Sequence, residues 1–411
     1  MSNQIFEPVP DIETAQPVSP DPEKSDRRSP LERFRTHPKK ALSVTDLVSP
    51  AWCELQYWYT LTKHGRKRRT PAMKEGSKVH KSLEEQVHTI VPVDVQTKED
   101  GWGLRIWNVI QGLRTLRDTG QTRELEIWGT IDGLVVNGII DELSYVCPDK
   151  ELEDSLKKLN KKEPLPDQPT IAEYFKATGA TTIEAATWKK RCSQGNKIYV
   201  CDVKTRSAHS LPSEMAFRST RMQLLLYHNL LATLSILTER YKLNPDKVFS
   251  DSFLVQVGSL NDEQFCDAKS APETPAGSQA SVTSWSHDSM TTLLEHNTLS
   301  SLWSLMISEF QTTLPDGAAS LGNVLKAEYR SRDTGQIVGT KTFAMNELEL
   351  KAYVEKEMQW WRGEREAQGV VVEEAFKCRS CEFAEGCEWR LKKVEEAKER
   401  VRMTRKRTAA V

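Results

Sequence analysis

The sequence lacks long apolar runs, a secretory leader and net charge. No stretch of about 18 consecutive apolar residues occurs in the 411-residue chain, so we expect no membrane-spanning segment. The first 25 residues are polar and include five acidic side chains, which is typical neither of a secretory signal nor of an Arg-rich mitochondrial presequence. The formal net charge of -1 does not by itself indicate a nucleic-acid partner, although basic residues gather at 63–69 and 392–407. Such runs also suit a solvated face or a localisation signal.

The chain also lacks the phosphate-binding string G-x-x-x-x-G-K-[ST], so we expect an activity that needs no ATP. Apolar residues make up 38% of the chain, which suffices for a large domain with part of the length solvated. We place a disordered, Pro- and Ser-rich tail at 1–40 and a basic tail at 396–411. The domain between them, at 41–395, is expected to carry a charged surface insertion at 148–196 and a mobile loop at 267–289.

Local sequence patterns predict a mixed α/β domain, with apolar residues at helical spacing in some segments and short β runs in others. Asp132-Gly133 is a hairpin turn signal between two of the strands. Asn346 and Gly369 are expected to begin and end the last helix before the cysteine cluster. The predicted helices begin near Ser43 or Thr45 and lie at 74–88, 101–120, 213–242, 302–310 and 346–368, and the predicted strands lie at 124–131, 135–146, 197–206, 252–257, 324–330 and 336–343.

An aromatic stretch at 50–60 lies directly before the basic residues at 63–69. Aromatic rings beside lysine and arginine can stack on the bases of a single strand. The alternative is that these rings belong to the core, and we expect that for at least half of them. The side chains concerned are Trp52, Tyr57, Trp58 and Tyr59.

Two acids and a lysine lie on two of the predicted strands, Asp141 on the first and Asp202 and Lys204 on the second. Residues two apart in a strand point to the same face, so Asp202 and Lys204 share a face that Asp141 joins if the strands are neighbours. Two carboxylates beside a lysine suit a Mg²⁺ or Mn²⁺ ion and the hydrolysis of a phosphodiester. Lys204 would orient the water or stabilise the developing charge. Taken alone, Asp-x-Lys also recurs by chance as an ion pair at a strand end.

Further motifs flank these strands in a definite order: Gly76-Ser-Lys-Val-His80, Gly138-Ile-Ile-Asp141 and Gln223-Leu-Leu-Leu-Tyr227. The series resembles the RecB-like branch of the PD-(D/E)XK nucleases, which implies a restriction-endonuclease-like α/β core with flanking helices. The alternative is that His80 and Tyr227 are core residues. The resemblance implies as metal ligands His80, Asp141, Asp202 and the main-chain carbonyl of Val203, as catalytic lysine Lys204, and as substrate contacts Gln223, Tyr227 and Arg206.

Eight cysteines occur, and an intracellular protein uses that many for metal binding rather than for disulfides. Cys378, Cys381 and Cys387 form a C-x₂-C-x₅-C cluster. Zinc and an iron–sulfur cluster both need a fourth ligand, for which Cys53 is the leading candidate, and spacing alone leaves both open. The arrangement resembles the iron–sulfur nucleases of the same branch, which favours a [4Fe-4S] cluster that joins the N- and C-terminal parts of the domain. The other cysteines are interpreted as small buried or bystander residues: Cys147, Cys192, Cys201 and Cys266.

The strings GIIDEL, DVKTR and CRSCEFAEGCEW are similar to those of the exonuclease V family, over about residues 41–395. This resemblance implies a metal-dependent exonuclease for single-stranded DNA that starts at a 5′ end and releases short oligonucleotides. It also implies a monomer, aided by a single-strand-binding protein, with a role in mitochondrial DNA maintenance or nuclear DNA repair. The chain departs from the family at Asp202, where the family has Glu, and in the long insertion at 148–196.

Two rival functions remain open. The chain could be a nucleic-acid-binding module with a structural zinc ion and an inactive nuclease site. It could also be a structure-specific endonuclease of the same fold, because the motifs do not determine whether a free strand end is needed.

Overall fold

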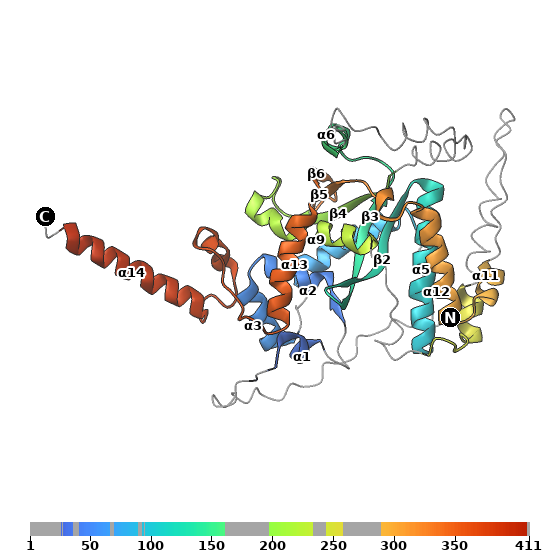
Figure 1. The fold of residues 1–411 in the computed structure, drawn as a ribbon, viewed down its shortest axis with the longest axis horizontal. Coiled ribbons are helices and arrows are strands. Elements are labelled where there is room, and N and C mark those ends of the chain that lie inside the picture. Colours follow the sequence, from blue (N-terminus) through green and yellow to red (C-terminus); the bar gives the residue numbers. More distant parts are fainter. Residues whose placement is uncertain are drawn as a thin grey trace, which may run out of the picture.

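The computed structural model describes residues 26, 28–35, 41–65, 70–88, 93, 95–160, 197–232, 244–257 and 289–408 (Figure 1). The predicted tail at 1–40 and the predicted insertion at 148–196 are therefore described only in part, and the predicted loop at 267–289 only at Ser289. Within the range predicted as a disordered tail, Pro30–Phe34 form a helix capped by Ser29, and Phe34 is buried in the core, so order begins earlier in the chain than predicted. Cys192, Cys266 and residues 66–69 of the basic run lie outside the described residues.

A six-stranded mixed sheet forms the centre of the described fold, in the order β1-β3-β4-β5-β6 with β2 also paired to β3. Strand β2 runs antiparallel along one edge of β3. The other edge of β3 is shared by β1, which pairs at Val136–Asn137, and by β4, which pairs at Glu142–Ser144. β4 pairs in parallel with β5, which pairs antiparallel with β6. The strands are β1 (Leu42–Ser43), β2 (Gln121–Ile131), β3 (Leu134–Ser144), β4 (Tyr199–Arg206), β5 (Val324–Ser331) and β6 (Ile337–Ala344).

Helices surround this sheet (Figure 1). Helix α9 contacts β2, β4 and β5, while α5 packs against β2 and carries α12 on another side. The α-helices are α1 (Pro30–Phe34), α2 (Val44–Val48), α3 (Glu54–His64), α4 (Pro71–Glu84), α5 (Lys98–Thr119), α6 (Lys150–Asn160), α9 (Glu214–Ala232), α11 (Ser289–Glu295), α12 (Leu299–Thr313), α13 (Glu347–Trp361) and α14 (Glu388–Thr408), and the 3₁₀ helices are η1 (Ser49–Ala51), η3 (Gly317–Ser320) and η4 (Val372–Ser380).

Several local signals act as predicted. Ser43 caps α2 and forms a capping box with Asp46, and Asn346 caps α13. Asp132 and Gly133 both have positive φ, 51° and 75°, as a two-residue hairpin turn between β2 and β3 requires. The mixed α/β class and the order of the strands around Asp141 are thereby confirmed.

The core beneath α9 explains one motif glycine. Leu224, Leu225 and Leu226 are wholly buried, and Tyr227 beside them is 5% exposed. A Cβ atom at Gly138 on β3 would lie 2.8 Å from a ring carbon of Tyr227, closer than a side chain tolerates. The glycine therefore allows α9 to approach the strand that carries Asp141.

Two predicted elements are wrong. Residues 251–257 are helical rather than a strand, because Ser250 caps them through a bond from the Phe253 N–H, and Phe253, Leu254 and Val257 are buried at helical spacing. Helix α13 ends at Trp361 and not near residue 368, because Gly363 already takes the left-handed conformation, at φ 76°, that stops a helix.

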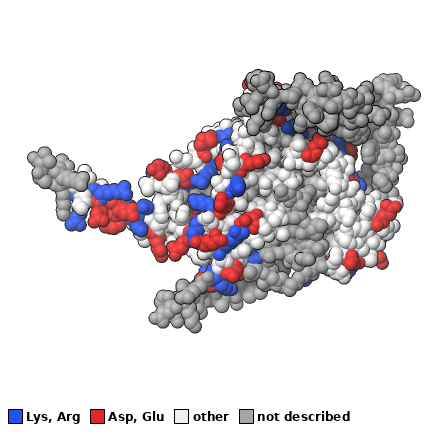
Figure 2. All heavy atoms as spheres, in the orientation of Figure 1, with Lys and Arg blue, Asp and Glu red and all other residues white. Residues whose placement is uncertain are grey.

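The surface in Figure 2 mixes both signs of charge, and α14 projects from the rest of the molecule with acidic and basic side chains side by side (Figures 1 and 2). Ion pairs along this helix include Lys393–Glu396 and Lys398–Glu395. None of the described helices has the length and apolar character that crossing a membrane requires.

Glu357 on α13 is a buried acid whose titration affects stability. It is 4% exposed, and its Oε2 has no hydrogen-bond partner among the described residues. Burial, aided by the charge of Glu54, raises the pKa of Glu357 from 4.5 to about 8. The folded chain thus keeps a proton that the unfolded chain releases, so this contribution to stability is complete below pH 4.5 and is lost as the pH rises towards 8.

We expect Glu357→Gln to remove this part of the pH dependence, because the amide does not ionise. The free energy of unfolding, measured by urea denaturation across the same pH window, should decline less steeply than in the wild type. Glu355→Gln on the exposed side of α13 is the control and should keep the wild-type slope. An unchanged slope in Glu357→Gln would contradict the raised pKa.

Candidate active site

β3 and β4 bring two acids face to face. In their antiparallel register Glu142 lies opposite Cys201, so the next residues of the two strands, Asp141 and Asp202, also lie opposite each other. The main-chain N–H of Val203 donates to Asp141 Oδ2 at 2.7 Å and ties the strands together at this point. Asp202 is wholly buried and Asp141 is 9% exposed, so both carboxyl groups are largely removed from water.

Lys204 satisfies only one oxygen of Asp202. Its Nζ donates to Asp202 Oδ1 at 2.7 Å, whereas Asp202 Oδ2 is buried without a partner among the described residues. Burial raises the pKa of Asp202 to about 7, against the opposing charge of Lys204 and with the help of Asp141. A divalent cation fits this position, because it would take the place of the proton and use the unpartnered oxygen.

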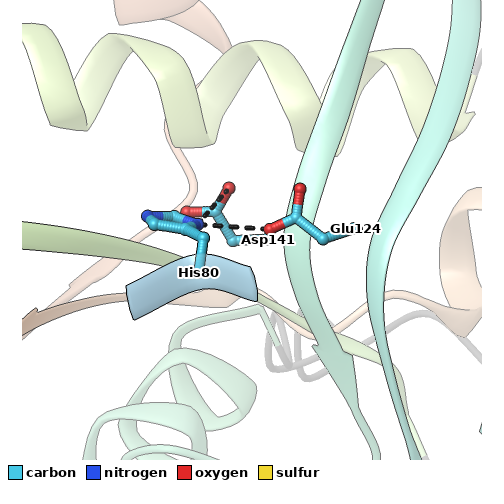
Figure 3. Close-up of side chains that lie close together, drawn as sticks. All are labelled: His80, Glu124 and Asp141. Atoms are coloured by element: carbon cyan, nitrogen blue, oxygen red, sulfur yellow. Dashed lines mark hydrogen bonds and ion pairs between the residues drawn. The ribbon is translucent and has the colours of Figure 1, made fainter. Parts of the chain in front are cut away.

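A histidine and a third acid complete the group (Figure 3). His80 reaches in from α4, and its Nδ1 lies 3.2 Å from Glu124 Oε1 and 3.9 Å from Asp141 Oδ1. Ligand atoms of these three residues all lie within 4.8 Å of one another. Burial lowers the pKa of His80, but the bond to Glu124 and the charges of Asp141 and Glu124 outweigh it and raise the pKa. Imidazole nitrogen and carboxylate oxygen together can hold Mg²⁺ or Mn²⁺.

Glu124 is the site residue that sequence reasoning missed. It lies on β2 between Arg123, paired with Glu142, and Leu125, paired with Ile140, and so faces Asp141. Its φ of 50° is strained for a residue other than glycine. A signal for its place did exist: counted back from the two-residue turn, residue 124 falls opposite residue 141. Strained backbone of this kind is often found where function requires a side chain in one position.

The three predicted substrate contacts lie at different places. Gln223 lines the cavity described below and donates to Tyr227 Oη at 2.9 Å, whereas Tyr227 is buried against β3. Arg206 is not among the residues that line this cavity, and its guanidinium lies 5.9 Å from the centre of the Tyr329 ring. The structure thus brings Gln223 to the site and leaves Arg206 at the end of β4.

A cavity of about 1350 Å³ leads away from these residues. Its walls come from the face of α3 that carries Gln56 and Thr60, from α4, and from the start of α9. His80, Glu124 and Lys204 lie on its wall, as do Ser380 and Glu382 of the cysteine segment. Among the described residues, most of the lining is hydroxyl, amide or apolar, and the lysines of the lining are Lys81 and Lys204. The cavity therefore connects the acid group with the C-terminal cysteines.

The four predicted cysteine ligands gather around a second, smaller cavity, at the start of α3 and on both sides of residues 382–386. Burial raises the pKa of the Cys53 thiol, and the charges of the other three thiols add to the shift, as expected for neighbouring sulfurs. Cys201 is buried in β4, and Cys147 is half-buried away from this group. The four cysteines that line the smaller cavity are Cys53, Cys378, Cys381 and Cys387.

Comparison with known proteins identifies similar chains. A sequence model of one family, described as exonuclease V, a 5′ deoxyribonuclease, matches residues 29–390. Exonuclease V of Danio rerio is 27% identical over 367 residues, which cover 88% of this chain and 73% of the relative. Mitochondrial exonuclease V of Candida glabrata is 24% identical over 49% of this chain and 42% of its own length. The Saccharomyces cerevisiae protein of the same name is 23% identical over 46% and 38%.

We expect Glu124→Gly to separate the fold from the cation site. Glycine relieves the strained φ, which should stabilise the cation-free protein by about 1 kcal/mol, while the loss of a carboxylate should weaken Mn²⁺ binding about tenfold or more. Thermal unfolding and titration of Mn²⁺ followed by electron paramagnetic resonance measure the two effects.

Asp132→Gly is the matched control, because Asp132 has a similar φ of 51° in the hairpin turn but lies outside the acid group. It should leave Mn²⁺ affinity at the wild-type value. Wild-type Mn²⁺ affinity in Glu124→Gly would exclude Glu124 as a ligand.

Proposed function

Because the chain belongs to the exonuclease V family and is therefore a hydrolase of DNA phosphodiester bonds, we propose that it digests single-stranded DNA from a 5′ end and releases short oligonucleotides. The observation that carries this proposal is the cavity that opens onto His80, Glu124 and Lys204. Its mixed hydroxyl and amide lining suits a strand that slides through it.

We assign the fold to the PD-(D/E)XK nucleases, with a Mg²⁺ or Mn²⁺ ion held by His80, Asp141, Asp202 and the carbonyl of Val203. Glu124 joins this set, since its Oε1 lies 3.2 Å from His80 Nδ1, closer than Asp141 Oδ1 at 3.9 Å. A bound cation would supply charge to the phosphate and lower the pKa of an attacking water. The shorter Asp202, in place of the family's Glu, still offers its unpartnered Oδ2 as a ligand atom.

The chain's own groups do the rest of the chemistry. Lys204, held by Asp202 at 2.7 Å and partly exposed to the cavity, presents a positive charge to the scissile phosphate. Gln223 lies on the same cavity wall and can donate to the strand backbone, with Tyr227 fixing its amide from the core side. The Val203 N–H keeps Asp141 in place while the DNA strand moves through the cavity.

We propose that the four cysteines hold a [4Fe-4S] cluster that joins α3 to the C-terminal part of the domain. All four cysteines line one small cavity, so four thiolate ligands are available at one place, as both zinc and a cluster require. One early cysteine combined with a C-terminal C-x₂-C-x₅-C set resembles the iron–sulfur nucleases, and this resemblance supports the cluster over zinc.

The proposed setting follows the relatives. Two yeast relatives are named mitochondrial, and we propose the mitochondrion, or the nucleus, as the compartment and genome maintenance or repair as the role. The protein acts as a monomer without ATP, on strands that a single-strand-binding protein keeps unpaired.

We expect the wild type to degrade linear single strands with Mg²⁺, and Asp202→Asn to lose at least about a hundredfold in rate, because the amide cannot provide the cation's charged ligand. Denaturing gels of end-labelled strands measure this. Asp251→Asn, at an exposed helix position, is the control and should cut normally. A wild type that cuts nothing with Mg²⁺ or Mn²⁺ would support the rival binding module.

A circular single strand tests the requirement for a free end. We expect circles to survive under conditions that degrade the linear strand of the same sequence, since the strand must thread into the cavity by its end. A linear strand blocked at its 5′ end by a bulky group should survive as well, whereas a 3′ block should not protect it. Cleavage of the circles would favour the structure-specific endonuclease.

We expect anaerobically purified protein to contain iron and to absorb at roughly 400 nm, as proteins with thiolate-bound iron–sulfur clusters do. Cys381→Ser should lose both the iron and the absorbance, and Cys147→Ser, outside the cysteine group, should keep both. Stoichiometric zinc in place of iron would refute the cluster and leave the acid site unaffected.

A further inference from the structure

Trp52 separates the two cavities of this protein. It lies between η1 and Cys53, and it lines both the large cavity that leads from the acid group and the smaller cavity of the four cysteines. Its side chain is half-buried, so part of its surface is open. A flat aromatic side chain on the wall of a strand-binding cavity offers a surface on which a nucleobase can stack.

A buried lysine supports the ring from the cysteine side. Lys377 is 2% exposed, and its Nζ lies 4.7 Å from the centre of the Trp52 ring. The same Nζ donates to the Trp52 carbonyl at 2.9 Å and to Glu374 at 2.6 Å. Lys377 lines the cysteine cavity but is not among the residues that line the large one. The ring is therefore held from behind, by a cation–π contact and by the anchored main chain.

The neighbouring aromatic side chains are used in other ways. Tyr57 also lines the large cavity, but it is 5% exposed and its hydroxyl donates to Asp46 at 2.5 Å. Trp58 packs edge-on against Phe34 at 5.9 Å, and Tyr59 packs against the ring of Phe383 at 5.6 Å. This leaves Trp52 as the aromatic side chain of the 50–60 stretch with both an open surface and a place on the cavity wall.

We propose that Trp52 stacks on an unpaired nucleobase of the bound strand and that Lys377 holds its ring in position for this contact. The proposal rests on the proposed action on single-stranded DNA and adds a residue that sets strand affinity. Trp52 acts on binding and not on the bond-breaking step, because it belongs to the cysteine end of the cavity and not to the acid group.

The position of Trp52 in the chain couples strand binding to the cysteine group. Cys53 follows Trp52 directly, and Cys378 follows Lys377 directly. Whatever the cysteines hold therefore places both the ring and the lysine that supports it. Loss of that centre should lower strand affinity even though none of the four thiols belongs to the acid group.

The test measures the affinity of the full-length chain for a labelled single strand by fluorescence anisotropy. All variants are made in the Asp202→Asn background, so that the strand is not cut, and are compared at equal metal content of the cysteine group. We expect Trp52→Ala to bind about tenfold more weakly, in the range expected for the loss of one base–aromatic stack, and Trp52→Phe to retain most of the affinity. Trp58→Ala is the matched control on α3 and should bind like the parent.

A fully abasic strand of the same length distinguishes stacking from a structural effect. Trp52→Ala and the parent should bind this strand equally, because no base is present to stack. Equal weakening on normal and abasic strands, or wild-type affinity of a folded Trp52→Ala, would overturn the proposal. A parent that binds no single strand at all would refute the proposed function together with it.

Lys377 is tested with its partner, because Lys377→Met alone would leave Glu374 charged and unpaired in the interior. The double variant Lys377→Met/Glu374→Gln should bind the normal strand about threefold more weakly, as expected for the loss of one cation–π contact, and the abasic strand like the parent. Parent-like binding of the normal strand by this double variant would refute the supporting role of Lys377 and leave the role of Trp52 standing.

Discussion

The pairing of β3 with β4 is the constraint on which the rest of the site depends. It holds Asp141 and Asp202 opposite each other, and the Val203 N–H fastens it at 2.7 Å from Asp141 Oδ2. Side chains alternate between the two faces of a strand, so a slip of one residue would turn Asp202 to the opposite face and bring Cys201 into its place. Gly138 contributes to this constraint, because it lets Tyr227 and α9 close over the strand pair.

The site is assembled at the expense of stability. Three acids share a small, partly buried space with one histidine and one lysine, the pKa of Asp202 is raised to about 7, and Glu124 holds a strained φ of 50°. Each feature destabilises the cation-free fold. Positive charge relieves the crowding of the acids and the raised pKa of Asp202, whereas the backbone strain at Glu124 remains. The surrounding core, with Leu224, Leu225 and Leu226 wholly buried on α9, keeps this arrangement in one geometry.

The two ends of the domain meet at the group of four cysteines. Cys53 comes from its beginning and Cys378, Cys381 and Cys387 from its end, while the large cavity extends from the acid group to this junction. Trp52 lines both cavities and therefore forms part of the wall between them. The cysteine group can therefore affect the strand without contacting the acids, since it positions one wall of the cavity.

The sequence alone determined the features that depend on interactions between residues close to one another in the chain. The caps at Ser43 and Asn346, the turn at Asp132–Gly133 and the alternation that puts Asp202 and Lys204 on one face depend on neighbours in the chain, and the structure contains them as predicted. The end of α13 and the helix at 251–257 were mispredicted, because a nearer glycine and a burial pattern outweighed the apparent signals.

Only the tertiary structure decided the contacts between distant segments. Glu124 contacts His80, which lies 44 residues away in the sequence, and no local pattern encodes the positive φ that Glu124 has there. Trp52 contacts Lys377, which lies 325 residues further along the sequence. Contacts of this kind depend on where the whole sheet and its helices settle, which composition and periodicity do not specify.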